Sequence, residues 1–179
     1  LRSAGTSDPL GLSGPEAVVD VGARVTNIVV HEGGVPKFVR ILLLGGDDIT
    51  GAIVERLGMP VGEAERLKRD KATLDSPASA DARRVIDAAL SEFVDEVRGS
   101  VDYYIATSGS RPLSRLVLSG GGSLADGLAQ RLATAVRTQV EYGRPFSQLS
   151  LGKTGLAPEQ VQFVEPLAAV PGGLAMGAV

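Results

Sequence analysis

The sequence predicts an α/β protein with a five-stranded mixed sheet, flanking helices and a small helical second lobe. Three observations lead to this fold class. Strand-like segments fill residues 17–44, helical patterns without any strand pattern fill residues 45–107, and strand patterns return after residue 108 around a triple glycine. Strands that alternate with helices in this way build a layered α/β domain.

Composition narrows the class of protein and of partner. The 179 residues are 44% apolar and 22% charged, which is ordinary for a globular protein with one substantial core. A formal net charge of -3 and an aromatic content of 4% do not favour a nucleic-acid partner, since such partners call for basic patches and stacking rings. There is no cysteine, which excludes disulfides and thiolate metal sites. No apolar run has the length of about 18 residues that suggests a transmembrane segment.

The first residues predict a lead-in rather than part of the domain. Residues 1–16 are rich in glycine, serine and proline, which is typical of a linker. They lack the basic and apolar regions of a signal peptide, and the sequence does not begin with methionine. We expect an N-terminal half to precede this sequence.

Three strands in a meander are predicted next. Ala17–Val21 is almost entirely apolar, as in a buried central strand, and Val25–Glu32 follows after a glycine turn. Gly33-Gly34 predicts a tight hairpin turn into a third strand, Val35–Leu44.

Three helices are predicted to form the second lobe. The first opens at Gly45-Gly46-Asp47-Asp48, with Asp47 as the expected N-cap, and ends at Gly58. The second spans Val61–Arg69. After a polar break at Asp75–Ser79, a long amphipathic helix carries one apolar stripe. The stripe consists of Ile86, Leu90, Phe93, Val97, Val101 and Tyr104.

The strand pattern then returns. Arg115–Ser119 is an apolar strand that ends in the triple glycine, and Ser123 is the expected cap of a helix through Leu128 and Leu132. Thr138–Tyr142 is the expected fifth strand. Residues 143–166 resemble a loop, and residues 167–179 a short apolar helix.

The first chemistry-bearing stretch is the hairpin at residues 18–30. An aspartate at the end of a buried strand, Asp20, can hold a hydrated divalent cation, while backbone N–H groups at Gly22 face a phosphate. The hydroxyl of Thr26 could add a donor. The pattern also fits a plain hairpin.

The triple glycine, Gly120, Gly121 and Gly122, is the second stretch. Glycines between a strand and a helix let a flat ring or a phosphate approach the backbone closely, although a simple tight turn explains them equally well. They are not a dinucleotide fingerprint, since Ala125 stands where that motif requires glycine.

Other polar residues are weaker candidates. Glu65 and Lys68 lie three residues apart on one side of a helix and could both meet a ribose. His31, the single histidine, is expected to be a surface residue, since no partner is placed to orient it for catalysis. Gly152-Lys153-Thr154 resembles the end of a phosphate loop but lacks the glycine that opens that motif.

Four stretches in order resemble the second domain of the actin-like ATPases, which have a ribonuclease H-like fold. VVDVGARVT at 18–26 is similar to the second phosphate motif of that superfamily, and AERLK at 64–68 to a helix that touches adenosine. LVLSGGGSL at 116–124 is similar to the adenosine motif, and PGGLAMGAV at 171–179 to the second connecting helix. The resemblance covers nearly the whole sequence. It implies subdomain IIA at 17–44 and 108–179, and subdomain IIB at 45–107.

Within the superfamily, LLLGGDDITGAI at 42–53 and GEAERLK at 62–68 resemble the PilM family of type IV pilus assembly, with the FtsA cell-division family as the near alternative. The resemblance implies ATP or ADP and Mg²⁺ as ligands. Asp20 would hold Mg²⁺ through water, and Gly22 and Thr26 would approach the phosphates. Gly120 to Gly122 would line the adenine, and Glu65 with Lys68 would bind the ribose.

The PilM resemblance also implies a cytoplasmic protein, peripheral to the inner membrane through pilus assembly partners of the PilN kind, with self-association possible. The turn departs from strong ATPases, which often carry glycine and threonine where Ala23, Arg24 and Val25 stand. The catalytic residues of the superfamily belong to the first domain, which these residues do not contain. We therefore expect nucleotide binding with slow ATPase activity at most, and an actin-fold scaffold stays an alternative.

Overall fold

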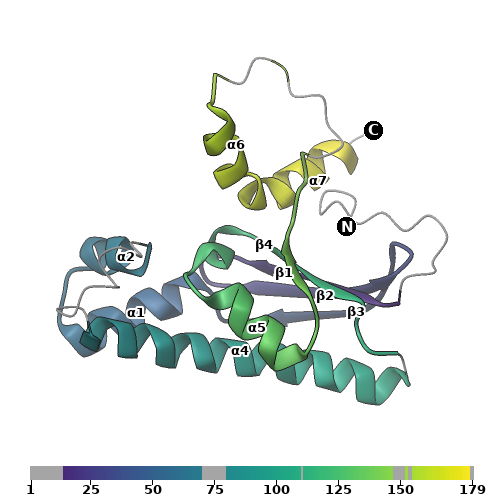
Figure 1. Ribbon diagram of the computed structural model, residues 1–179, viewed down its shortest axis with the longest axis horizontal. Coiled ribbons are helices and arrows are strands. Elements are labelled where there is room, and N and C mark those ends of the chain that lie inside the picture. Colours follow the sequence, from purple (N-terminus) through teal and green to yellow (C-terminus); the bar gives the residue numbers. More distant parts are fainter. Residues whose placement is uncertain (1–13, 70–79, 110, 147–151, 153–154, 178–179) are drawn as a thin grey trace.

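A computed structural model describes residues 14–69, 80–109, 111–146, 152 and 155–177, and a five-stranded mixed sheet forms their centre (Figure 1). The strands are β1 (Glu16–Val21), β2 (Thr26–Glu32), β3 (Val35–Leu42), β4 (Arg115–Ser119) and β5 (Val140–Tyr142), in the order β3-β2-β1-β4-β5. β2 is antiparallel to both β1 and β3, whereas β4 is parallel to both β1 and β5. The predicted fold class is thus confirmed. Most of the predicted lead-in lies outside the described residues.

Three strands are shorter than predicted: β2 starts at Thr26 instead of Val25, and β3 and β5 each lose two residues. A threonine hydroxyl makes a hydrogen bond just beyond the shortened end of β3 and of β5. β3 stops at Leu42, and beyond it the Thr26 hydroxyl donates to the Leu44 carbonyl at 2.8 Å. β5 begins at Val140, and before it the Thr138 hydroxyl donates to the Leu113 carbonyl at 2.9 Å. The hairpin turn at Gly33-Gly34 is confirmed, with φ of 56° and 81°.

In the described part of the chain, three helices cover one side of the sheet. They are α1 (Gly46–Leu57), α4 (Ala80–Ser108) and α5 (Leu128–Val136), and α2 (Val61–Arg69) packs against α1 (Figure 1). The six residues of the predicted stripe on α4 are all buried, which confirms the amphipathic helix. The predicted polar break at Asp75–Ser79 lies outside the described residues.

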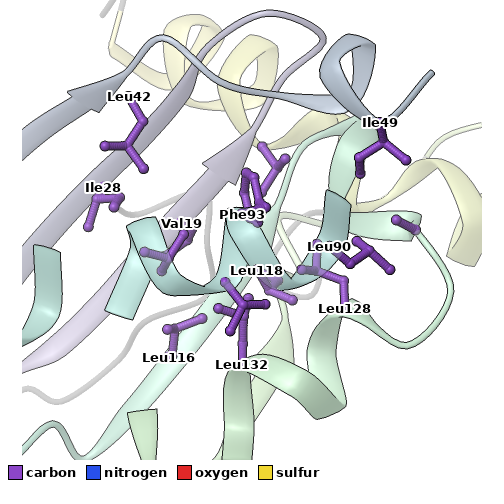
Figure 2. Packing of buried hydrophobic residues seen from close by; sticks show 14 of the residues in the cluster. Val19, Ile28, Leu42, Ile49, Leu90, Phe93, Leu116, Leu118, Leu128 and Leu132 are labelled. Carbon is purple, nitrogen blue, oxygen red and sulfur yellow. The ribbon is translucent and has the colours of Figure 1, made fainter. Parts of the chain in front are cut away.

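One hydrophobic cluster connects the sheet to these helices (Figure 2). Val19 of β1 and Ile28 of β2 belong to it together with Leu90 and Phe93 of α4, and α5 contributes Leu132. The long helix therefore shares its core with the sheet. The division into subdomains at residues 45 and 107 stays a prediction.

The start of α1 differs from the prediction in its cap. Gly45 takes the N-cap position, and its N–H donates to the Asp48 carboxylate at 2.7 Å. The Asp47 N–H instead donates to the Ala23 carbonyl at 2.7 Å, so the first turn of the helix is docked onto the β1–β2 turn. Asp47 is therefore inside the helix and the predicted cap is wrong. The predicted stop at Gly58 is confirmed by its left-handed conformation, φ 64°.

The stretch after β4 also begins its helix later than predicted. A 3₁₀ turn, η3 (Gly121–Leu124), follows the strand, and α5 starts at Leu128 with Gly127 as its N-cap. The buried Ser123 hydroxyl donates to the Gly120 carbonyl at 2.6 Å, so Ser123 closes the glycine turn and does not cap α5.

The C-terminal part contains more helix than predicted. α6 (Pro158–Val164), η4 (Pro166–Ala168) and α7 (Ala169–Gly177) lie on the side of the sheet opposite α4 (Figure 1). α6 falls in the segment expected to be a loop; Pro158 opens it, and the Gln160 side chain accepts the Ala157 N–H at 2.9 Å. Among the described helices, none combines the length and the apolar character that crossing a bilayer requires.

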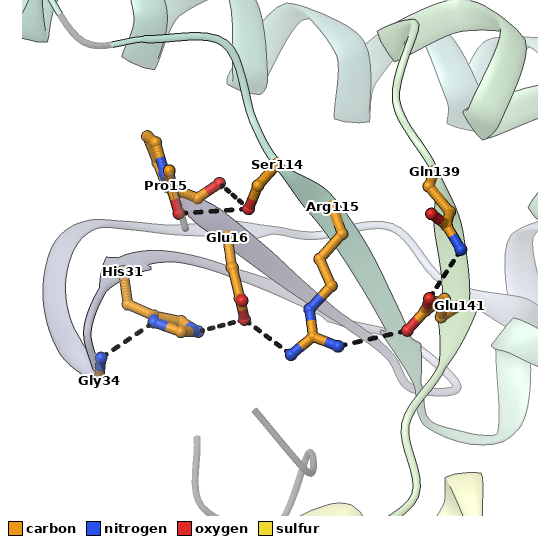
Figure 3. A network of polar contacts seen from close by, with 9 residues as sticks. Pro15, Glu16, His31, Gly34, Ser114, Arg115, Gln139 and Glu141 are labelled. Atoms are coloured by element: carbon orange, nitrogen blue, oxygen red, sulfur yellow. Dashed lines mark hydrogen bonds and ion pairs between the residues drawn. The ribbon is translucent and has the colours of Figure 1, made fainter. Parts of the chain in front are cut away.

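His31 is buried, so the expectation of a surface residue is wrong. Only 2% of the residue is exposed, and its Nε2 lies 3.6 Å from a carboxylate oxygen of Glu16 (Figure 3). Arg115 pairs with Glu16 at 3.1 Å and with Glu141 at 3.3 Å. The Gly34 N–H donates to His31 Nδ1 at 3.3 Å, so the ring fastens the β2–β3 hairpin to this network. Burial lowers the pKa of His31, and the charge of Glu16 only partly opposes that shift.

Candidate functional site

A cavity of about 200 Å³ opens where the β1–β2 turn, the start of α1, α2 and the triple glycine meet. Five of the eight predicted site residues line it, namely Gly22, Glu65, Lys68, Gly121 and Gly122. The other lining residues are Ala23, Gly46, Asp47, Ile49, Arg69, Leu124, Ala125, Phe163 and Leu167. The other three predicted residues, Asp20, Thr26 and Gly120, are not among the lining residues.

The β1–β2 turn forms one wall. The Gly22 N–H donates within the turn to the Val25 carbonyl at 2.9 Å, and the Gly22 carbonyl accepts the Gly46 N–H at 3.0 Å. A Cβ on Gly45 would lie 2.5 Å from the Ala23 carbonyl oxygen, so only glycine lets the helix start approach this closely. The turn and α1 therefore act as one rigid element.

Asp20 sits at the carboxyl end of β1, in register with Ser119 of the parallel strand β4. The Ser119 hydroxyl lies 2.9 Å from the Asp20 carboxylate and 3.1 Å from the Pro166 carbonyl, and its single proton can serve only one of them at a time. Within the described ranges, no group of three or more acidic or histidine side chains could hold a metal. A magnesium ion at Asp20 would thus depend on water and phosphate oxygens for its remaining ligands, as Mg²⁺ commonly does.

Thr26 is fully buried at the start of β2. Its hydroxyl donates to the Leu44 carbonyl at 2.8 Å and so ties β2 to the segment that leads into α1. The side chain thus supports the turn from behind.

The triple glycine forms the opposite wall. Gly120 has a φ of +83°, and its N–H donates to the Pro166 carbonyl at 2.9 Å. A Cβ on Gly122 would lie 2.5 Å from Cγ1 of Val21. These two glycines therefore allow β4 and the β1–β2 turn to meet, while the exposed Gly121 faces the cavity.

A polar network on α1 and α2 forms the third wall. The buried Lys68 ammonium lies 2.9 Å from the Gly46 carbonyl, 2.8 Å from the Thr50 hydroxyl and 2.8 Å from a Glu65 oxygen. These three acceptors match its three protons. The Thr50 hydroxyl lies 2.6 Å from the same Glu65 oxygen and therefore donates to it. The network holds α2 against the first turn of α1.

The charge state of Glu65 follows from this network. Burial by itself would raise the pKa of the carboxyl, but hydrogen bonds from Lys68, Thr50 and Arg69 and the charge of Lys68 outweigh it and lower the pKa to about 2. Glu65 is thus ionised at neutral pH, and its charge is paired with those of Lys68 and Arg69 in the cavity wall.

Sequence reasoning missed several residues of the site. Arg69 follows Lys68 directly and pairs with Glu65 at 2.6 Å, so its spacing of four residues from Glu65 was a usable signal. Thr50 lies one helical turn after Gly46, but only the packing of α2 gives it a role. Phe163 and Leu167 reach the cavity from α6 and η4, and no local pattern relates them to it.

Comparisons with known proteins agree with this architecture. A family described as type IV pilus assembly protein PilM matches residues 13–179. Among solved structures, a PilM–PilN type IV pilus biogenesis complex is similar at 30% identity and a TM-score of 0.77, with 92% of this chain and 46% of that chain covered.

More distant likenesses concern the fold alone. MreB5 of Spiroplasma citri bound to ADP aligns at 16% identity and a TM-score of 0.63, covering 98% of this chain and 56% of that one. The archaeal actin homolog Ta0583 aligns at 16% identity and 0.58, covering 92% and 50%. These neighbours show an actin-like fold. The chain spans about half the length of the structures that it matches.

Proposed function

Because this chain belongs to the family of type IV pilus assembly protein PilM, we propose that it binds an adenine nucleotide, ATP or ADP, in the cavity between its two glycine turns. The observation that carries the proposal is the convergence of Gly22, Gly121 and Gly122 with the Glu65–Lys68 pair around one opening. Backbone without side chains accommodates a flat ring, and a charged helix beside it supplies polar contacts. The nucleotide that MreB5 carries, in its ADP-bound structure, points to the same ligand class.

We propose the following roles for the residues of the three walls. Gly121 and Gly122 line the adenine, with Gly120 setting the turn, and Glu65 accepts a ribose hydroxyl. The Lys68 ammonium can donate a hydrogen bond to the ribose only if it gives up one of its three present acceptors. The nucleotide therefore competes with the network for one N–H of Lys68. The cavity of about 200 Å³ is smaller than the roughly 300–1,000 Å³ of most ligand sites. We therefore expect this chain alone to bind nucleotide weakly.

The phosphates extend toward Gly22, with Asp20 holding Mg²⁺ through water. When bound, the ion would neutralise phosphate charge, and the chain contributes a single carboxylate whose geometry is set by Ser119. Thr26 supports the turn beneath the phosphates, since its hydroxyl is engaged with the Leu44 carbonyl.

An Asp20→Ala change in the complete protein tests this assignment by calorimetry with Mg-ATP. Loss of measurable binding is expected, because Asp20 is the carboxylate assigned to the ion. The exposed Glu55→Ala, on the outer face of α1, is the matched control and should bind as the unaltered protein does. Unchanged affinity in Asp20→Ala would remove Asp20 from the site.

We further propose that nucleotide binding changes the contact with inner-membrane pilus proteins of the PilN kind, which would place the protein in the cytoplasm at that membrane. The neighbouring PilM–PilN complex supports the partner class. ATPase activity is slow at most. Capture of the complete protein by a PilN-like cytoplasmic segment should differ between ATP, ADP and no nucleotide; equal capture in all three would contradict nucleotide control.

A scaffold without a working nucleotide site is the second candidate. The observation in its favour is that the Gly22 N–H and the Thr26 hydroxyl are both hydrogen-bonded inside the protein. Native mass spectrometry of the complete protein for co-purified ATP or ADP separates the two candidates. Sedimentation with ATP and lipid tests the filament behaviour expected of an FtsA-like protein.

A further inference from the structure

The outer edge of the sheet is formed by β3, which lies at the end of the strand order. A strand in this position leaves one row of backbone N–H and C=O groups without a strand to pair with, and another chain can use this row as a template. Apolar side chains line it. Val39 is 61% exposed, Ile41 is 60% exposed, and Leu43 just beyond the strand is 86% exposed.

A hollow accompanies this edge on the α4 side. It is lined by residues 40–44 and by three carboxylates of α4, those of Glu92, Asp95 and Glu96. All three side chains are exposed, and within the part of the chain that the structure describes no ion pair or hydrogen bond engages their carboxylates. The edge thus combines free backbone groups, an apolar face and an acidic face.

The two faces are separated by the pleat of the strand. Phe38 and Leu42 point toward α4, where Phe38 packs on Tyr104 with ring centroids 5.8 Å apart, whereas Val39 and Ile41 point to the other side. A strand added beside β3 would continue this alternation. Its side chains would face the carboxylates of α4 and the exposed valine and isoleucine in turn.

We propose that the β3 edge and the acidic row of α4 form a docking groove for an extended segment of a partner protein in which basic and apolar residues alternate. The segment adds a sixth strand to the sheet, with backbone hydrogen bonds to β3. Its basic side chains pair with Glu92, Asp95 and Glu96, and its apolar side chains cover Val39 and Ile41. Complementary charge of this kind sets which partner binds and how fast.

Charge decides between the possible occupants. Pairing of two β3 edges in a dimer would bring the three carboxylates of each α4 together, and only Arg40 of the hollow lining is basic. A lipid surface with anionic headgroups would be repelled by the same row. A basic extended peptide is the occupant that satisfies the apolar and the acidic side at once.

The probe is a fluorescein-labelled octapeptide that alternates valine and lysine, added to the full chain and followed by anisotropy. Four control peptides accompany it. One alternates valine and glutamate, one has its valines and lysines in two blocks, and two are the valine–lysine peptide with N-methyl groups on one or the other set of alternate backbone nitrogens. Of the three peptides without N-methyl groups, we expect only the alternating valine–lysine peptide to bind. N-methylation of one parity should weaken it at least tenfold and N-methylation of the other parity by less than twofold, because only every second N–H faces β3.

The protein side is tested by E92K/D95K/E96K, with E55K/E63K/E159K as a control of equal charge change on other exposed sites. The first variant should bind the probe at least tenfold more weakly and lose its salt dependence, while the control changes less than threefold. Circular dichroism confirms that both fold. Equal weakening in the two variants, or equal effects of both methylation parities, would overturn the proposal. The proposal would also be overturned if E92K/D95K/E96K strengthened dimerisation, or if the chain floated with anionic vesicles. Either result would show that a second copy or a membrane occupies the groove.

Discussion

Glu65 makes the stability of the folded chain depend on pH. Its pKa of about 2 in the folded chain lies below the ordinary value of 4.5, so the folded state favours the ionised form. The stability that this preference contributes is present above pH 4.5 and is lost as the pH falls toward 2. We predict that Glu65→Gln lowers the urea unfolding midpoint at pH 7, and that the difference from the unaltered chain shrinks between pH 4.5 and 2.

The measurement is a urea titration at several pH values, with Glu63→Gln as the control, since that residue is exposed on the same helix and outside the network. A difference that persists undiminished at the lowest pH would show that the network does not depend on the charge of Glu65.

The pKa of His31 is shifted mainly by burial, whereas that of Glu65 is shifted by its hydrogen bonds and its ion pair. The pKa of His31 is lowered, so the unfolded chain takes up this proton first and stability falls as the pH drops below the ordinary value of 6.5. Because the sequence has a single histidine, its ring signals in NMR need no assignment. We predict a titration midpoint below 6.5, and a midpoint at or above that value would contradict a ring buried beside Glu16.

At the scale of elements, the triple glycine makes the clearest prediction. Gly120→Ala places a side chain at φ +83° and against the backbone of Val21, so it combines strain with overlap. We predict a loss of about 1–3 kcal/mol in the free energy of unfolding.

The control for this change is Gly51→Ala on α1. A Cβ at Gly51 would have no neighbour within 4 Å, and alanine is the better helix former by about 1 kcal/mol. The two alanine variants should therefore shift the denaturant midpoint in opposite directions. A neutral Gly120→Ala would mean that the β4 turn can relax away from β1.

The elements that sequence predicts well are those whose signal is local. The apolar stripe on α4 repeats with the helical period over several turns, and Gly58 ends α1 because a left-handed residue is needed there. Gly33-Gly34 fixes its hairpin for the same kind of reason. In the candidate site, the spacing of Glu65 and Lys68 predicts that both lie on one side of a helix, and the structure pairs them at 2.8 Å.

The features that sequence misses depend on partners far along the chain. Asp47 has the chemistry of a cap, but its N–H is taken by Ala23 across the β1–β2 turn. Ser123 is equally suited to a cap and is used by Gly120 instead. His31 is buried opposite Glu16 of β1, which in turn pairs with Arg115 of β4, so its surroundings come from three strands. No window of sequence around these residues contains that information.

At the scale of the whole molecule, the shared core predicts how the chain unfolds. Leu90 of α4 is fully buried among residues of the sheet and of α5, in the cluster that joins them (Figure 2). A helical lobe with its own core would unfold separately, whereas a helix that completes the core of the sheet unfolds together with it. Truncation of this one side chain therefore tests whether residues 45–107 form an independent unit.

We predict that Leu90→Ala lowers the free energy of unfolding by about 2–5 kcal/mol, because it leaves a cavity in the common core. Hydrogen exchange followed by mass spectrometry should show protection falling by the same factor in α4, β1 and β4. Leu174→Ala on the exposed face of α7, where the side chain is 71% exposed, is the matched control and should change protection little. If α4 lost protection while β1 and β4 kept theirs, the helical segment and the sheet would be two separate folding units. The helical segment could then move over the nucleotide independently of the sheet.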